Sequence, residues 1–157
     1  GGFGDRERTL LIMKDPRSGP IAVITLVLVL LLKFAALLAL IEQRQTLALI
    51  IVPVLGRGAL LGLFLTTPYV RAGGLGQALA DHLPRHSGWQ VLLACALGGV
   101  LVAGWVGVSA LVIALTVFIG LRQMMLRRLG GCTGDTAGAL LELLEMVVLV
   151  GLVLIWN

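Results

Sequence analysis

The sequence predicts an all-α membrane protein, a polytopic bundle of about five transmembrane helices preceded by a short interfacial helix. Hydrophobic residues make up 59% of its 157 residues, whereas charged residues make up 13%. A soluble domain usually carries charges on about a quarter of its residues, so a water-soluble fold is excluded. The apolar residues gather in runs close to the roughly 20 residues that cross a bilayer as a helix. A disulfide scaffold is also excluded, because Cys95 and Cys132 are the only cysteines.

The N-terminal segment is expected to lie on the membrane surface. Residues 1–5 contain no Met, and the segment does not have the pattern of a signal peptide, so we expect residues 1–157 to be one membrane domain and a fragment of a longer chain. Residues 5–19 predict an amphipathic helix that ends at Pro16, because a residue before proline is disfavoured in the α region. Its cations could lie near anionic lipid, or they could bind phosphate while neighbouring acids hold a metal. The residues of the second interpretation are Arg8, Lys14 and Arg17 for phosphate, and Asp5 and Asp15 for a metal.

The stretch 90–121 is either one long helix or two short helices joined near Gly104. Cytoplasmic loops carry an excess of Lys and Arg. Two helices place nine cations on one side and only Arg44 on the other, whereas one helix divides the same ten cations six to four. We therefore expect two helices and a cytoplasmic N-terminus, with thinned bilayer or protein beside spans that reach only about 24 Å. The five expected spans are 21–41, 47–65, 90–103, 107–122 and 137–156.

Two cations lie at membrane depth, where a charge costs at least about 2.5 to 3.5 kcal/mol on insertion scales. Arg57 lies between Gly56 and Gly58, where a ligand or another backbone can approach closely. Its guanidinium could bind phosphate with two donors, or it could pair with an acidic residue of another helix. Lys33 could instead extend its ammonium toward the membrane surface.

The loop at residues 71–76 places Arg71 beside three glycines. Backbone N–H groups of such a loop can cradle a phosphate, although the strand and spacing of known phosphate-binding motifs are absent. His82 and His86 have a helical metal-binding spacing, but Pro84 lies between them. We interpret both histidines as ordinary loop residues.

A glycine-rich turn enters the last span, and three acids follow it. Thr133 or Asp135 could cap the helix, but a cap does not explain Glu142 and Glu145, which lie two to three turns inside. Cys132 in the same turn is weak evidence for a nucleophile.

The helical positions of these acids limit a metal site. Asp135 and Glu142 differ by about 10 Å in height, too far for easy joint ligation of one ion, whereas Glu142 and Glu145 are neighbours on the helix surface. We expect the carboxylates to meet ligands from other helices, as when Mg²⁺ is shared between one or two carboxylates and substrate phosphates.

Two segments resemble the signatures of the cobalamin synthase family, the adenosylcobinamide-GDP ribazoletransferases. Residues 8–19 resemble its stretch R-x-x-x-x-M-[RK]-D-x-x-x-G, and residues 131–145 resemble G-x-T-G-D-x-x-G-A-x-x-E-x-x-E. Lys33, Arg57 and Arg71 follow in the order that the family has. Its acidic D-G-x-x-D-x-x-D-G segment is expected upstream of residue 1, so we expect this fragment alone to be inactive.

The resemblance implies a transferase of cobalamin biosynthesis in the bacterial inner membrane, with its active site facing the cytoplasm. The enzyme would join adenosylcobinamide-GDP to α-ribazole or its 5′-phosphate and release GMP, with Mg²⁺ as cofactor. It would bind lipid but no nucleic acid, and it could form a homo-oligomer. The implied residues are Asp135 and Glu142 for catalysis; Arg8, Lys14, Arg57 and Arg71 for substrate phosphate; and Asp135, Glu142, Glu145 and Asp15 for the metal.

Two other functions fit the intramembrane charges. In a small transporter or channel subunit, Lys33, Arg57 and the two glutamates would line a polar path; another membrane alcohol phosphotransferase is the second alternative. A transport path needs polar residues through the whole membrane, whereas the charges here gather toward the expected cytoplasmic side. The phosphoryl transferase is therefore favoured, since such chemistry needs positioning and charge neutralisation.

Overall fold

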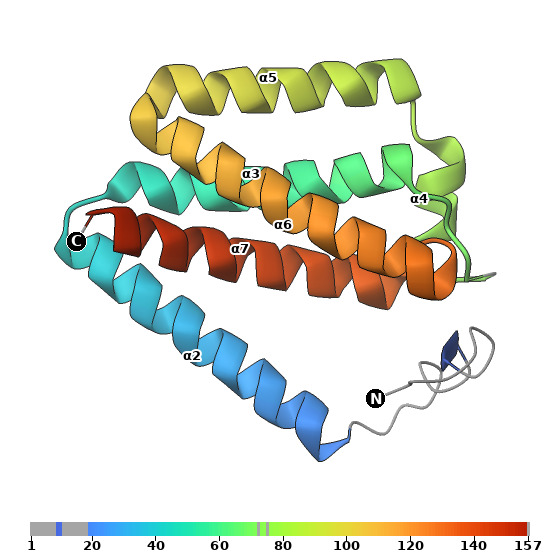
Figure 1. The fold of residues 1–157 in the computed structure, drawn as a ribbon. Coiled ribbons are helices and arrows are strands. Elements are labelled where there is room, and N and C mark those ends of the chain that lie inside the picture. The colour runs from blue at the N-terminus through green and yellow to red at the C-terminus, as the bar shows by residue number, and fades with distance from the viewer. Residues whose placement is uncertain (1–8, 11–18, 72, 75, 157) are drawn as a thin grey trace.

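The computed structural model describes residues 9, 10, 19–71, 73, 74 and 76–156. Of the expected interfacial helix, the described residues include Thr9, Leu10 and Gly19. The predicted site residues Arg8, Lys14 and Asp15 lie outside the described residues. The described elements are all helical (Figure 1): α2 (Pro20–Glu42), α3 (Thr46–Thr66), α4 (Gln77–His82), α5 (Arg85–Ala103), α6 (Trp105–Leu129) and α7 (Gly134–Trp156).

Five of these helices, all except the short α4, are long and apolar enough to cross a membrane. The predicted all-α membrane fold is confirmed. Pro53 lies inside α3 without ending it. Many large apolar side chains of α2, α5 and α6 face outward, as expected of surfaces that contact lipid rather than water.

The ambiguous stretch forms two helices that separate at Gly104. This residue has φ +55° and ψ −127°, a backbone conformation that side-chain-bearing residues rarely adopt. The helices are longer than hydropathy indicated, because α5 begins at Arg85 among polar residues and α6 continues to Leu129 past three arginines. With 19 and 25 residues, they reach about 28 and 37 Å. Both helices are therefore longer than the roughly 24 Å that the apolar stretch indicated for each of them.

Helix α7 is the centre of the bundle. It packs against α2, α3 and α6, while α5 lies outside on α3 and α6 (Figure 1). Leu140, Leu144 and Leu152 of α7 are completely buried, together with Leu40 of α2 and Leu63 of α3. Side chains on α7 are therefore positioned by three neighbouring helices.

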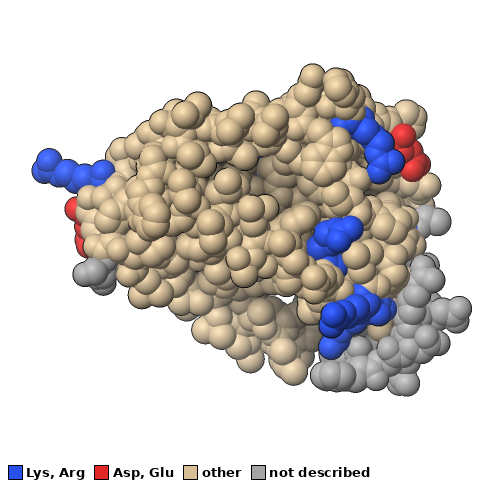
Figure 2. Space-filling model, turned by 45° about the horizontal axis from the view of Figure 1, so that its top comes forward, with Lys and Arg blue, Asp and Glu red and all other residues tan. Residues whose placement is uncertain are grey.

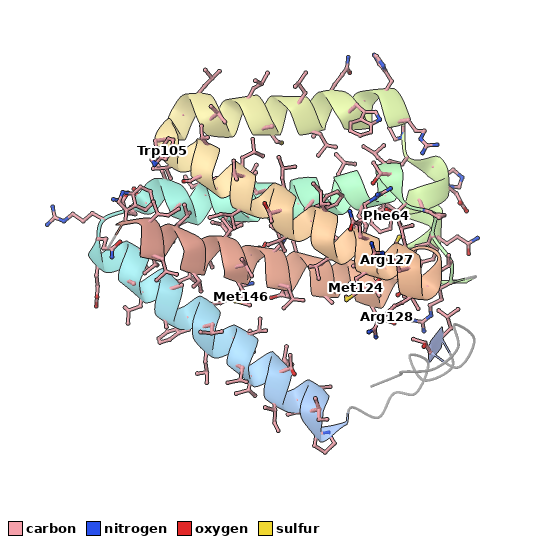
Figure 3. All side chains as sticks on the ribbon, in the orientation of Figure 1. Phe64, Trp105, Met124, Arg127, Arg128 and Met146 are labelled. Carbon is pink, nitrogen blue, oxygen red and sulfur yellow. The ribbon has the colours of Figure 1, made fainter. Side chains whose placement is uncertain are left out.

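One end of the bundle carries most of the described charges, and we call it the basic end. There α2, α5 and α7 begin, and α3 and α6 end (Figure 1). Figure 3 shows Arg127 and Arg128 toward this end of α6, with Trp105 at the helix's other end. The described charges of the opposite end are Glu42 and Arg44, beside the turn between α2 and α3.

Candidate functional site

Two loops pair with each other at the basic end. The backbone N–H of Val70 donates to the Cys132 carbonyl (2.9 Å), and the N–H of Cys132 donates to the Pro68 carbonyl (2.8 Å). Gly131 permits this approach, because a Cβ there would overlap the Pro68 carbonyl oxygen and lie 2.5 Å from a Val70 methyl group. The pairing brings Arg71, which follows α3, beside the first turn of α7.

Thr133 caps α7. The N–H of Thr136 donates to Thr133 Oγ1 (3.3 Å), and the N–H of Thr133 donates to Thr136 Oγ1 (2.9 Å). This reciprocal pair has the geometry of a capping box, with Thr in place of the usual Glu or Gln. Of the two capping candidates, Thr133 takes that role, and the Asp135 carboxylate is directed to another group.

That group is Arg71. Its Nη1 donates to Asp135 Oδ2 at 2.6 Å, and the Asp135 side chain is 56% exposed. The α7 N-terminus favours a carboxylate at this position. An exposed ion pair contributes only about 0 to 1 kcal/mol, so an incoming ligand could rearrange it at little cost. The pair offers a hydrogen-bond acceptor and a guanidinium, a group suited to phosphate, on one accessible surface.

Four further charged side chains meet between α2, α3 and α7, and we call them the mid-membrane cluster: Lys33, Arg57, Glu142 and Glu145. Lys33 Nζ donates to Glu142 Oε2 and to Glu145 Oε2, both at 2.8 Å. Arg57 Nη1 donates to Glu145 Oε1 at 3.0 Å. The four charges sum to zero, which lowers the cost of holding them at membrane depth. The cations that Glu142 and Glu145 lack within α7 are supplied by α2 and α3.

Burial differs sharply within the mid-membrane cluster. The side chains of Lys33 and Glu145 are 16% and 12% exposed, whereas those of Glu142 and Arg57 are 45% and 65% exposed. The structure shows Arg57 in the salt bridge that was one of its two interpretations. Its exposed guanidinium and the exposed Glu142 carboxylate are the parts of the cluster that a ligand can reach.

Gly56 makes the α3–α7 contact possible. A Cβ at this position would lie 2.7 Å from Glu145 Oε1 and 2.8 Å from Leu141 Cδ1. The neighbouring Gly58 has more space, since its Cβ would meet only Leu92 at 3.6 Å. The glycine before Arg57 thus serves close packing of α7 rather than the approach of a ligand.

The structure divides the predicted site residues into two groups. Arg71 and Asp135 lie at the basic end, whereas Arg57, Glu142 and Glu145 lie about 10 to 15 Å deeper along α7. A ligand that engages both groups must extend over that distance. Lys33, which was not among the predicted site residues, joins both glutamates; its position at membrane depth was the signal that pointed to it.

The donor set fits a magnesium ion only if substrate supplies further ligands. Among the residues that the structure describes, no group of three or more His, Cys, Asp or Glu side chains lies together. Magnesium in proteins is often held by one or two carboxylates and by substrate phosphates. The exposed carboxylates of Asp135 and Glu142 suit that role, whereas both oxygens of Glu145 already accept from cations. Asp15 lies outside the described residues.

Two of the three glycines after Arg71, Gly74 and Gly76, lie against an aromatic ring. A Cβ at Gly74 would overlap the Tyr69 hydroxyl, and one at Gly76 would lie 2.9 Å from the same ring. These glycines are thus explained by packing against Tyr69. His82 Nδ1 donates to the Ala78 carbonyl, and His86 contacts Gln90; each ring has an ordinary surface partner.

Cys132 is completely buried. Burial raises the pKa of its thiol, because the charged thiolate is poorly solvated there. A thiol with a raised pKa is a poor nucleophile at neutral pH. The structure therefore adds nothing to the weak sequence evidence for a catalytic cysteine.

Two arginines at the basic end were not predicted as functional. Arg85 Nη2 donates to the Leu65 carbonyl (2.8 Å), and Arg122 Nη2 donates to the Thr66 carbonyl (2.7 Å). Both carbonyls belong to the last turn of α3, where helical partners are missing. The sequence shows that these arginines lie in a loop and near a helix end. It does not show that both contact the last turn of α3.

Comparisons with known proteins agree on one family. The family model described as cobalamin-5-phosphate synthase matches residues 1–153. An adenosylcobinamide-GDP ribazoletransferase of Pseudomonas fluorescens strain Pf0-1 is 77% identical over 154 residues, which cover 98% of this chain and 63% of the relative. The protein of the same name from Pseudomonas savastanoi pv. phaseolicola is 70% identical over 155 residues, covering 99% and 64%.

A third relative with that name, from Pseudomonas putida strain GB-1, is 66% identical over 154 residues and covers 98% and 62% of the two chains. The chain therefore spans less than two thirds of the length of the curated relatives it matches. No solved structure matches it.

Proposed function

Since the chain belongs to the cobalamin-5-phosphate synthase family, we propose that it forms the larger part of an adenosylcobinamide-GDP ribazoletransferase. The proposed reaction transfers the cobinamide phosphate of adenosylcobinamide-GDP to α-ribazole or its 5′-phosphate. The observation that carries this proposal is the family match over residues 1–153. The relatives carry the name of this transferase, and none of those reported above is a transporter, channel or other alcohol phosphotransferase.

In the proposed reaction, a ribose hydroxyl of the acceptor attacks the phosphorus next to cobinamide. A new P–O bond forms, the bond to the bridging oxygen breaks, and GMP leaves. Little covalent chemistry is needed from the protein in phosphoryl transfer, where positioning and electrostatic stabilisation dominate. Side chains must therefore neutralise phosphate charge and accept the proton of the hydroxyl.

The Arg71–Asp135 pair supports a location of this chemistry at the basic end. Asp135 can accept the hydroxyl proton, because its carboxylate is exposed and ionised groups of this kind act as general bases. Arg71 can then bind a phosphate oxygen with the guanidinium, which is well suited to phosphate. Arg57 and Glu142 can contact a part of the substrate that reaches about 10 Å deeper.

Magnesium is the proposed cofactor, and either Asp135 or Glu142 would hold it together with phosphate oxygens of the substrate. When bound, the ion would neutralise charge on the phosphates. We further propose that the basic end faces the cytoplasm of a bacterial inner membrane, since cytoplasmic loops are rich in Lys and Arg. Formation of a homo-oligomer stays a prediction.

A chimera tests the function. This chain replaces the matching 154 residues of the Pseudomonas fluorescens Pf0-1 relative, and the protein in lipid is supplied with Mg²⁺, adenosylcobinamide-GDP and α-ribazole. We expect cobalamin and GMP in equal amounts. A well-folded chimera that makes neither product overturns the proposed function.

Two pairs of variants test the site. Asp135→Asn should reduce turnover about 100-fold or more, the scale of a lost general base, while Asp81→Asn at the same end should not. Arg71→Gln should raise KM or lower kcat, with Arg127→Gln as its control. If the chimera is active and Asp135→Asn retains the full rate, the site assignment is wrong while the function stands.

A further inference from the structure

An apolar cavity of about 360 Å³ lies between α3, α5 and α6. This volume is within the range of about 300 to 1,000 Å³ that ligand pockets have. Its walls include Ala59 and Gly62 of α3, Leu92 and Ala96 of α5, and Phe118 of α6. None of the residues of the mid-membrane cluster lines it, and neither do Arg71 and Asp135.

Contacts at the two ends of α5 explain the cavity. Near the basic end, Gly88 packs on Leu65, where a Cβ would lie 3.1 Å from two Leu65 methyl groups. At the opposite end, Gly107 of α6 packs directly on the Gly99 backbone of α5. Figure 1 shows α5 and α6 diverging from their shared turn. Between these contacts α5 buries little surface, and the small side chains of α3 leave the space unfilled.

The cavity has the depth of one bilayer leaflet. Along α3 its wall runs from Thr66, the last residue of that helix, to Val54. Twelve residues of helix span about 18 Å, and half of the hydrocarbon core is about 15 Å. A smaller cavity of about 220 Å³ shares Val54, Leu55 and Cys95 and continues toward the opposite end. The space is therefore long and narrow, and it begins at the membrane surface.

Two cations lie at the outer end of this space. Arg85 and Arg122 donate to the carbonyls of Leu65 and Thr66, and Thr66 lines the cavity. Carbonyl groups are neutral, and no carboxylate among the described residues pairs with either arginine. Their positive charge is thus left for an anion. Figure 2 shows basic side chains gathered at this end of the molecule, beside a long surface without charge.

We propose that this cavity binds one acyl chain of an anionic phospholipid, whose phosphate lies beside Arg85 and Arg122. The apolar walls and leaflet-length depth fit a hydrocarbon chain, and the two cations at the surface fit a phosphate attached to it. The lipid is a bound ligand that fills the gap under α5, distinct from the exchanging lipid around the bundle. This site is separate from the proposed transferase site and does not depend on that activity.

The test measures lipid retained by the full chain. The protein is placed in nanodiscs of phosphatidylcholine with a minor fraction of phosphatidylglycerol, and bound lipid is counted by native mass spectrometry after release. We expect one retained phosphatidylglycerol. Gly62→Leu fills the cavity from α3 and Ala96→Phe fills it from α5; each should lower retention about tenfold, the effect of losing about two buried methylenes. Gly120→Leu is the matched control, because a Cβ there meets nothing within 4 Å.

The headgroup is tested separately. Arg85→Gln should lower the preference for phosphatidylglycerol over phosphatidylcholine about fivefold, the scale of one cation near an anionic surface, while Arg127→Gln should not. Three outcomes would overturn the proposal: equal retention of both lipids by the wild type, unchanged retention by folded Gly62→Leu and Ala96→Phe variants, or a dimer that these variants convert to monomer. Because Arg85→Gln leaves the cavity walls intact, it remains informative if a filling variant does not fold.

Discussion

Removal of the Lys33 ammonium is the sharpest test of the mid-membrane cluster. Lys33→Met keeps most of the side-chain volume but leaves Glu142 and Glu145 without their shared donor. Lys33 and Glu145 are largely buried, with both hydrogen bonds of the ammonium at 2.8 Å. The remaining cluster then has a net charge of −1, with Arg57 as its one cation.

The expected loss of stability follows from this burial. Breaking a buried ion pair by removing one partner costs about 3 to 5 kcal/mol, whereas an exposed pair contributes at most about 1 kcal/mol. Glu142 is half-exposed and Arg57 still pairs with Glu145, so we expect the lower end, about 3 kcal/mol. Lys33→Met/Glu142→Gln restores a neutral cluster and should recover about half of that loss.

The assay is unfolding in mixed detergent micelles, which is monitored by circular dichroism. Arg127→Met is the matched control, since it removes a cation from an exposed position and should change stability by less than about 0.5 kcal/mol. The reasoning is refuted if Lys33→Met is as stable as this control. It is also refuted if the double variant is less stable than Lys33→Met, because neutrality would then not be what stabilises the cluster.

Three further predictions concern packing, capping and thiol chemistry. Gly56→Ala should destabilise the protein by about 1 to 3 kcal/mol through overpacking, while Gly58→Ala should have little effect, as thermal unfolding in detergent can show. Thr133→Ala should cost about 1 kcal/mol by removing the α7 cap. Burial raises the pKa of the Cys132 thiol, so labelling of Cys132 by iodoacetamide should stay slow from pH 7 to about 8.5, the pH at which an ordinary thiol ionises. Mass spectrometry measures the labelling, with Ser87→Cys as an exposed reference thiol. The folded state favours the neutral thiol. The contribution of this preference to folding stability is therefore fully present below the ordinary thiol pKa, and it is lost as the pH rises above that value.

The membrane fold could be predicted because long apolar runs and the distribution of arginines are properties of the sequence alone. The break at Gly104 followed from the positive-inside rule, and the structure places two helices there. The helix ends could not be predicted, because α5 and α6 continue into polar residues such as Arg85 and Arg122, where hydropathy falls while helical hydrogen bonding persists.

The site could be predicted as a set of residue types but not as a set of contacts. Glu142 and Glu145 needed cations, yet no spacing in the sequence shows that α2 crosses α7 where Lys33 meets both. Likewise, Gly74 and Gly76 have the composition of a phosphate-binding loop, but they pack against the Tyr69 ring of the same segment, a contact that residue spacing does not show. Partners distant in sequence are fixed by helix packing, which single-residue patterns do not encode.

The long sequence separation within the mid-membrane cluster has a consequence for biosynthesis. Lys33 precedes Glu142 by 109 residues, which at about 5 to 20 residues per second takes roughly 5 to 20 s to synthesise. Helix α2 can still enter the bilayer, because its many Leu, Ile and Val residues, each favourable by about 0.3 to 0.6 kcal/mol, outweigh one lysine. The Lys33 ammonium then lies in the membrane without its two glutamate partners until α7 is synthesised. A chain that stops before α7 therefore keeps this uncompensated charge in the membrane.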